Sequence, residues 1–335
     1  MGVRRSGPLM LSVMVAFGVI AMACGGSSGG SGSTAKPAFL VTYPGIDPAE
    51  EQLKIGGLKA GQELGVDVVW RTPQTFDVAQ QLDVTESALT YPNLKGVAVV
   101  AADPNGLEGA MTKAKGQGLA LAQGAGCADN TTAPICFDTH PPALGATAAK
   151  YMCPLMNSTG DVVIGQGTLG DVNNASRQHG FEDYMKANCP NIHVVQVLYG
   201  CDHPENTVSC AQNALSRFPN LAGYYANGDG VAVGATVFTK AGKHVVVGSL
   251  DVSPVTLQYV KDGTIAFTLM QPLQCMGYLL VYSNYLQAVE HKKATVKYVD
   301  LGATYLDQKN VDQQQAAQQS TCTQLNAKWK NEVFK

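Results

Sequence analysis

Residues 161–181, DVVIGQGTLGDVNNASRQHGF, decide the fold because they contain a buried strand, a glycine-rich turn and the start of a polar helix. The apolar run at residues 161–164 is typical of a strand in a parallel sheet. The turn after it brings Asn173, Asn174 and Arg177 to the carboxyl end of that strand. Ligands of open α/β sheets bind at that edge, so we expect these three residues to contact a ligand.

The same turn matches the dinucleotide-binding fingerprint Gly-x-Gly-x-x-Gly at Gly165, Gly167 and Gly170. In that motif the third glycine lies inside the helix, whereas here we expect the loop to continue to Asn173, as the helix N-cap. The fingerprint also requires an acidic residue about 20 positions further on, and the end of the next strand, Asp202, lies too far away. We therefore interpret the match as fortuitous.

Length and composition indicate an exported protein with two lobes. The 335 residues are 45% hydrophobic, enough for a sizeable core. Residues 9–23 form an apolar segment preceded by Arg4 and Arg5, shorter than the roughly 20 residues of a membrane-spanning helix, and we interpret it as an export signal. Without those two arginines the 23 basic residues become 21 against 26 acidic ones, a charge of −5. A negative chain without a basic run predicts no nucleic-acid partner.

The cysteines agree with export. Setting Cys24 aside leaves eight of the nine, which allow 105 pairings. Proximity along the chain favours Cys127–Cys136, Cys201–Cys210, Cys153–Cys189 and, by remainder, Cys275–Cys322. No spacing suits a zinc site, so we expect no metal and no cofactor.

The rest of the chain alternates strands and helices. We expect strands at residues 38–43, 66–71, 96–101, 119–123 and 135–138, and then at 161–164, 193–198, 222–227, 244–248, 264–271 and 295–300. We expect helices at 48–65, 77–91, 104–118, 141–156, from 173, 205–217, 229–241, up to 262, and 273–290. This order predicts an α/β fold with two doubly wound parallel sheets.

Polar side chains follow nearly every predicted strand. The strand-end positions are Tyr43, Asp103, Gln123, Asp138, Asn173 with Arg177, Asn227, Asp251 and Gln271. Carboxylates accept hydroxyl protons, amides donate and accept, and a guanidinium can bind two oxygens. The set therefore predicts a ligand rich in hydroxyl groups.

Several of these residues have a plain structural alternative. Asp47, which opens the first helix, could be just its N-cap or a ligand contact, and Asp103 before Pro104 could likewise be a cap. Asp138 could serve only to set the turn into the second lobe. Aromatic residues that could stack on a sugar are Tyr43, Trp70, Phe76 and Tyr224, although such residues are more often core.

Motifs in chain order resemble the sugar-binding, ribose-binding-like branch of the type I periplasmic binding proteins. They are GGLKAGQELGVDV, GVAVVAADPNGL, the 161–181 turn, YYANGDGVAVGA, VVVGSLD and TLMQPLQCMG, and they span residues 39–312. The resemblance implies two Rossmann-like lobes joined by a three-strand hinge, with crossovers near Asp138, Gln271 and Asp300. It also implies a cleft in which Asn227 and the two residues Asp251 and Gln271 contact the ligand.

The chain departs from that family at the site. Ala49 and Glu50 stand where ribose binders carry paired phenylalanines, and Gln123 with Gly124 stands where they carry an Asp-Arg pair. Ala175 replaces a binding arginine, which leaves an ion-pair role for Arg177 as an alternative. These departures argue against ribose itself.

The start of the chain resembles the lipobox of bacterial lipoproteins. Ala-Met-Ala-Cys24 precedes GGSSGGSGST, a flexible tether. We therefore expect a signal peptide at 1–23, acylation of Cys24, a tether at 24–36, lobe 1 at 37–139 plus 272–300, and lobe 2 at 140–271 plus 301–335. An ordinary cleaved signal with an unrelated cysteine is the alternative.

The resemblance implies a monomeric solute receptor on the extracytoplasmic face of a bacterial membrane, in the periplasm or at the cell surface. It would deliver a sugar or polyol to an ABC permease. A ligand sensor for a chemoreceptor or sensor kinase, built on the same clamp, is the alternative. An enzyme ranks third, because no Gly-x-Ser-x-Gly motif, pair of catalytic acids or metal cluster occurs.

Overall fold

The computed structural model describes residues 35–127, 130–202, 205–314, 318, 322, 324–325 and 332–335. The predicted signal segment, Cys24 and all but the last two residues of the predicted tether lie outside these residues. No described helix has the length and apolar character that crossing a bilayer requires. Every element described below belongs to one compact body within residues 36–335.

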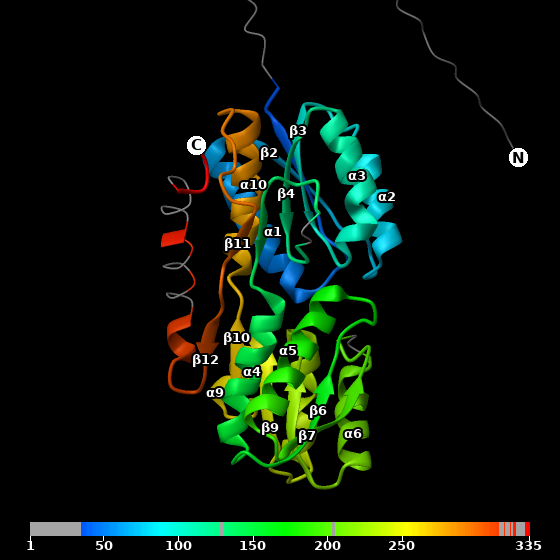
Figure 1. Ribbon diagram of the computed structural model, residues 1–335, viewed down its shortest axis with the longest axis vertical. Coiled ribbons are helices and arrows are strands. Elements are labelled where there is room, and N and C mark those ends of the chain that lie inside the picture. The colour runs from blue at the N-terminus through cyan, green and yellow to red at the C-terminus, as the bar shows by residue number, and fades with distance from the viewer. Residues whose placement is uncertain are drawn as a thin grey trace, which may run out of the picture. The chain divides into compact units, whose positions relative to one another are not determined.

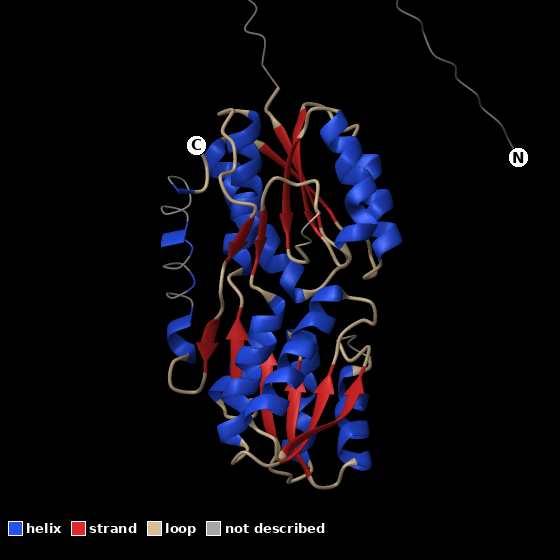
Figure 2. Cartoon of the chain, viewed as in Figure 1, coloured by secondary structure: helices blue, strands red, loops and turns tan. Residues whose placement is uncertain are grey.

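Two six-stranded sheets form this body, with strand orders β11-β5-β4-β3-β1-β2 and β12-β10-β9-β8-β6-β7 (Figure 1, Figure 2). All the pairings are parallel except that of β12 with β10. In both sheets the first strand of the lobe lies between its second and third strands. The predicted α/β fold with two doubly wound lobes is confirmed.

The first lobe begins with β1 (Ala38–Thr42), α1 (Pro48–Leu64), β2 (Asp67–Arg71), α2 (Val78–Ala88), β3 (Leu94–Val100), α3 (Pro104–Gly116), β4 (Ala120–Gly124) and β5 (Cys136–Asp138). The second contains α4 (Pro141–Leu155), β6 (Gly160–Gly165), α5 (Val172–Asn188), β7 (Ile192–Leu198), α6 (Thr207–Arg217), β8 (Leu221–Ala226), α7 (Asp229–Ala232), η1 (Val233–Ala235), α8 (Thr236–Lys240), β9 (Val246–Leu250), α9 (Pro254–Lys261) and β10 (Phe267–Met270). The chain returns to the first lobe with α10 (Leu273–Ala288) and β11 (Tyr298–Asp300), then to the second with β12 (Thr304–Leu306) and η2 (Val311–Gln313).

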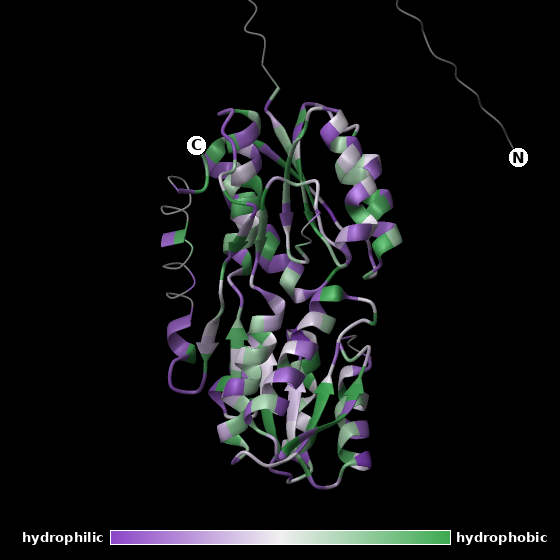
Figure 3. Cartoon of the chain, viewed as in Figure 1, coloured by the Kyte–Doolittle hydropathy of each residue, from purple (hydrophilic) through white to green (hydrophobic). Residues whose placement is uncertain are grey.

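Each sheet has a hydrophobic core on both faces. In β1, Phe39 and Val41 pack into the core that includes α10, while Leu40 packs into the core on the opposite face, as strand alternation requires. The second sheet divides its residues in the same way, with Ile164 on one face and Val163 on the other. The inner strands are correspondingly rich in hydrophobic residues (Figure 3).

The N-cap of helix α5 lies two residues earlier than the sequence predicts. Asp171, not Asn173, is its N-cap: the carboxylate Oδ1 accepts from the backbone N–H groups of Asn173 at 2.7 Å and Asn174 at 3.1 Å. A carboxylate at this position satisfies two N–H groups that have no partner inside the helix. The side chain of Asn173 is thereby left for another role.

Other differences lie in the second lobe. The helix expected at 229–241 is divided by the 3₁₀ segment η1, where Gly234 approaches α6 so closely that a Cβ atom would lie 2.6 Å from the Thr207 carbonyl oxygen. Strand β9 begins at Val246 and β11 at Tyr298, both later than expected. Strand β12, an antiparallel edge strand of three residues, was not expected.

The assignment of residues 301–335 to lobe 2 is wrong at the C-terminus. Val333 and Phe334 are buried in the core of lobe 1, and Phe334 pairs with Ala294 in an antiparallel bridge. The disulfide Cys275–Cys322 also ties this tail to α10. This return could not be predicted, because two apolar residues at a chain end carry no signal of which core they will join.

Four disulfides join the described cysteines: Cys127–Cys136, Cys153–Cys189, Cys201–Cys210 and Cys275–Cys322. Proximity along the chain predicts the first three of these pairs, and the fourth, Cys275–Cys322, follows by remainder; all four predictions are confirmed.

Candidate ligand-binding site

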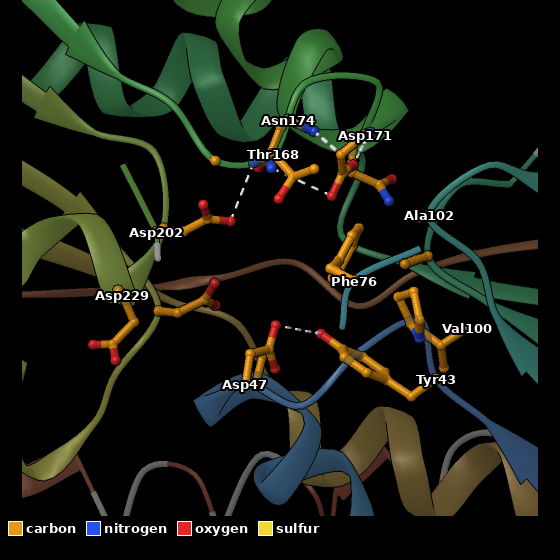
Figure 4. A pocket seen from close by; sticks show the side chains of 18 of the residues that line it. Tyr43, Asp47, Phe76, Val100, Ala102, Thr168, Asp171, Asn174, Asp202 and Asp229 are labelled. Atoms are coloured by element: carbon orange, nitrogen blue, oxygen red, sulfur yellow. Dashed lines mark hydrogen bonds between the residues drawn. The ribbon is translucent and has the colours of Figure 1, made fainter. Parts of the chain in front are cut away.

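The carboxyl ends of the strands in both sheets border one cavity of about 350 Å³. This volume is at the lower end of the range typical of small-molecule sites, roughly 300 to 1,000 Å³. Nine of the predicted site residues line it: Tyr43, Asp47, Asp138, Asn173, Asn174, Arg177, Asn227, Asp251 and Gln271. Figure 4 shows several of them around the cavity.

The loop from β1 to α1 forms one wall. Asp47 caps α1 by accepting from the Glu50 backbone N–H at 2.7 Å through Oδ1, and its Oδ2 accepts from the Tyr43 hydroxyl at 3.1 Å. The capping role of Asp47 is confirmed, and the same carboxylate lies at the cavity with its second oxygen bonded to Tyr43 (Figure 4).

A series of hydrogen bonds links residues at the end of β5 of the first lobe with residues that follow β9 and β10 of the second. The Asp138 carboxylate accepts from the Thr139 backbone N–H at 2.8 Å, and the Thr139 hydroxyl donates to Gln271 Oε1. Gln271 Nε2 then donates to Asp251 Oδ1 at 2.7 Å. Asp251 has a φ of 65°, a conformation that Asp and Asn tolerate better than most residues. These hydrogen bonds hold Thr139, Gln271 and Asp251 together at the same cavity.

The start of α5 forms the opposite wall with β6 and β8. Arg177 Nη2 donates to Asn174 Oδ1 at 2.8 Å, and its Nε donates to the Asn173 carbonyl at 3.3 Å. Asn227 Nδ2 donates to Gln166 Oε1 and to the Asn174 carbonyl. The side chains on this wall are held in place by the protein itself, as a preformed site requires.

Asn173 joins the two lobes directly. Its Oδ1 accepts from the Gly126 backbone N–H at 2.8 Å, and its Nδ2 lies 3.5 Å from the Ala101 carbonyl oxygen. Beside it the Val172 N–H donates to the Ala102 carbonyl at 3.3 Å. These contacts lie on loops that follow strands β3 and β4 of the first lobe.

The cavity is strongly acidic. Six of its lining residues are aspartates: Asp47, Asp138, Asp171, Asp202, Asp229 and Asp251. Burial raises the pKa of Asp47 from 3.8 to about 7 and that of Asp251 from 3.8 to about 6, although hydrogen bonds to both carboxylates oppose the shift. Burial raises the pKa of Asp138, Asp171 and Asp229 as well.

Two predicted site residues do not line the cavity. Asp103 caps α3 by accepting from the Asn105 N–H at 2.9 Å, the alternative that its position before Pro104 left open. Gln123 is buried in lobe 1, where Nε2 donates to the Gly126 carbonyl at 3.0 Å and Oε1 accepts from the Thr131 hydroxyl. Its side chain supports the loop that contacts Asn173 and does not reach the cavity.

Two of the four aromatic residues considered for stacking on a sugar lie at the cavity. Tyr43 and Phe76 line the cavity, whereas Trp70 and Tyr224 do not. Trp70 Nε1 donates to Glu50 at 2.8 Å, and Tyr224 is fully buried against Phe238.

Several lining residues were missed by the sequence interpretation, among them Thr75, Thr139, Thr168, Asp171, Asp202 and Asp229. The Asp202 carboxylate accepts from the Thr168 N–H at 3.2 Å (Figure 4). Asp202 was identified as the end of a strand, which is the signal that could have included it. Thr168 lies in a turn whose side-chain direction no pattern predicts.

A polar cavity between the strand ends of two parallel-sheet lobes defines a two-lobed α/β ligand-binding protein. Residues 38–294 match the family model described as a periplasmic binding protein domain, and the chain belongs to that family. Among the described residues no group of His, Cys, Asp and Glu is arranged to hold a metal ion.

The chain is also similar in structure to solved solute-binding proteins. The chain is similar to a sugar-binding protein of a sugar ABC transporter from Bacillus halodurans, with 26% identity and a TM-score of 0.72 over 83% of this chain and 99% of that one. It is also similar to an ABC transporter solute-binding protein from Burkholderia graminis in complex with D-arabinose, with 25% identity and a TM-score of 0.78 over 82% and 96%. An arabinose-binding protein from Geobacillus stearothermophilus has 26% identity and a TM-score of 0.70 over 83% and 98%. A comparison with curated proteins finds no match.

Proposed function

We propose that this protein is an extracytoplasmic solute receptor that captures a sugar or sugar-like polar molecule between its lobes and delivers it to an ABC importer. The observation that carries the proposal is the cavity of about 350 Å³ at the strand ends of both sheets, lined by carboxylate, amide and guanidinium groups. Such groups bind hydroxyls in both directions, as donors and as acceptors. The similar proteins that bind arabinose support the same ligand class.

The nine lining residues predicted from the sequence are proposed as the ligand contacts. Hydrogen bonds already orient Asn227 and Gln271, and Tyr43 with Phe76 supplies an apolar surface for a sugar face. The receptor acts by binding alone, without catalysis. It is a monomer held at the outer face of the membrane by acylation of Cys24 and the tether that follows.

Thermal shift and calorimetry with pentoses, hexoses and polyols test this function. A ligand at 100 times its dissociation constant should stabilise the protein by about 2.7 kcal/mol. The recovered sugar should be chemically unchanged after incubation with the protein. Absence of binding across the panel, or conversion of the sugar, would overturn the proposal.

A further inference from the structure

The cavity contains far more negative than positive groups. Among the residues that the structure describes, six aspartates line it, and Arg177 is the one basic side chain that does so. A neutral ligand would leave this excess of negative charge in place, whereas a cationic ligand would reduce it. The excess of carboxylates therefore favours a positively charged ligand.

The protein neutralises these carboxylates only in part: the nearby charge of Arg177 lowers the pKa of Asp138, Asp171 and Asp251, against the larger opposite effect of their burial. Within the described residues, Asp47, Asp138, Asp171 and Asp251 form no salt bridge, although Asp138 and Asp251 are more than nine-tenths buried. Arg177 donates its hydrogen bonds to Asn173 and Asn174, not to a carboxylate. Buried carboxylates without a paired cation are unfavourable, so their ionised forms are stabilised by any cation that enters.

Two of the carboxylates lie on different lobes and repel each other. Asp47 comes from the loop before α1 in lobe 1, and Asp251 follows β9 in lobe 2. After burial, the charge of Asp251 is among the causes that raise the pKa of Asp47. A cation between them would remove this repulsion and would draw the two lobes together.

Other carboxylates of the cavity are occupied by protein donors. Asp229 accepts from the Thr256 hydroxyl, and Asp171 accepts from the two N–H groups that it caps. Asp47 accepts from the Glu50 backbone N–H and from the Tyr43 hydroxyl, and Asp251 accepts from the Gln271 amide, so all of these donors are neutral. An ionised carboxylate has room for further donors, because it can accept about four hydrogen bonds.

We propose that the ligand is a hydroxylated compound with one basic nitrogen, an amino sugar or aminocyclitol, whose ammonium group lies between Asp47 and Asp251. This inference rests on the proposed function and specifies the ligand class of the same site. The ammonium has three donors for the two carboxylates, and the ligand hydroxyls are left for Asn227 and Gln271. The aromatic faces of Tyr43 and Phe76 also favour a cation nearby.

Calorimetry at neutral pH with matched pairs tests the proposal: D-glucosamine with D-glucose, D-galactosamine with D-galactose, and D-mannosamine with D-mannose. A charge-assisted hydrogen bond contributes about 1.5 to 3 kcal/mol, so the best amino sugar should bind roughly tenfold to a hundredfold more tightly than its neutral parent.

Asp47→Asn removes the charge and keeps a helix cap, since Asn caps helices about as well as Asp. The preference for the amino sugar should then fall to within about threefold of the parent. Asp103→Asn is the matched control, because Asp103 also caps a helix ahead of a proline but lies outside the cavity. It should leave the preference unchanged.

The outcomes separate the two proposals. Binding of neutral sugars without tighter binding of any amino sugar overturns this inference and leaves the sugar-receptor function standing. A preference that persists in Asp47→Asn removes the ammonium from the position proposed here. Absence of binding by every compound overturns both proposals.

Discussion

Gly145 of α4 packs against the backbone of Arg177 on α5 so closely that a Cβ atom on Gly145 would lie 1.8 Å from the Arg177 carbonyl oxygen. The same contact holds the start of α5, and with it the polar wall of the cavity, against α4. A glycine in a packing position therefore sets the position of an arginine that lines the cavity.

Gly145→Ala should destabilise the protein by about 1 to 3 kcal/mol, because the added methyl group overlaps main-chain atoms that cannot move without shifting a helix. Ligand affinity should also fall, since Arg177 moves with α5. Gly109→Ala is the control: its Cβ would meet no atom within 4 Å on the exposed side of α3, and it should stabilise by roughly 0.5 to 1 kcal/mol. Chemical denaturation checks both values, and equal stability of the two variants would contradict the packing argument.

Gln271→Ala should weaken ligand binding by about 2 kcal/mol, some thirtyfold, because it removes the donor to Asp251 and the acceptor for Thr139. Asp251→Asn is the suitable partner variant, since Asn keeps the left-handed conformation at φ 65° that Ala disfavours. The exposed Gln308 donates to the Lys261 carbonyl, and neither residue lines the cavity, so Gln308→Ala should leave the dissociation constant unchanged. Unaltered affinity in a folded Gln271→Ala protein would remove this residue from the site.

Asn173→Ala should accelerate ligand release. The change removes the hydrogen bonds between Asn173 and the main chain of Gly126 and Ala101, which join the lobes next to the cavity. Two such bonds contribute about 1 kcal/mol each, so the dissociation rate should rise at least about fivefold while association changes little. Asn188→Ala, at the other end of α5, is the control in stopped-flow measurements. Identical release rates in the two variants would show that this contact does not hold the ligand-bound form.

The unliganded protein should lose stability as the pH rises from about 4 to about 7. The folded-state pKa of Asp47, about 7, and that of Asp251, about 6, both lie above the ordinary value of 3.8. In this interval the folded protein binds more protons than the unfolded chain, so deprotonation favours unfolding.

Differential scanning fluorimetry between pH 4.5 and 7.5 measures this dependence. Asp47→Asn cannot titrate, and its melting temperature should fall less steeply with pH than that of the unmodified protein. A melting temperature that rises across the same interval would contradict the raised pKa values.

Loss of the Cys153–Cys189 disulfide should cost more stability than loss of Cys127–Cys136. The sequence separations are 36 and 9 residues, and the entropy of the closed loop in the unfolded chain grows with its length. The difference should be about 1 kcal/mol in the free energy of unfolding. Paired Cys→Ser variants measured by denaturation test it, and an inverse order would refute the loop-length argument.

The fold could be predicted because its signals are local. The capping and proline pattern of Asp47 and Pro48 specifies the start of α1, and Gly65 in the left-handed region ends it. The apolar runs that form β1 and β6 have the length and composition of buried strands. Three of the disulfides could also be predicted, because each joins cysteines that are close to each other along the chain.

The composition of the site depended on the tertiary structure. Asp47 and Asp103 share the same local sequence pattern, an aspartate before a proline at a helix start. Asp47 lines the cavity, whereas Asp103 only caps its helix. The direction of a side chain after a strand depends on loop backbone angles, such as the φ of 53° at Ala125 and 58° at Gly126, and these are set by contacts distant in sequence.

The sequence by itself therefore determined the order of strands and helices, the two-lobe class and the polar character of the strand ends, because these follow from short-range periodicity and capping. Only the tertiary structure decided which aspartates share one cavity, which residue caps α5 and where the C-terminal tail packs. Those outcomes depend on the distances between segments far apart in the chain, and such distances are not encoded in any local pattern.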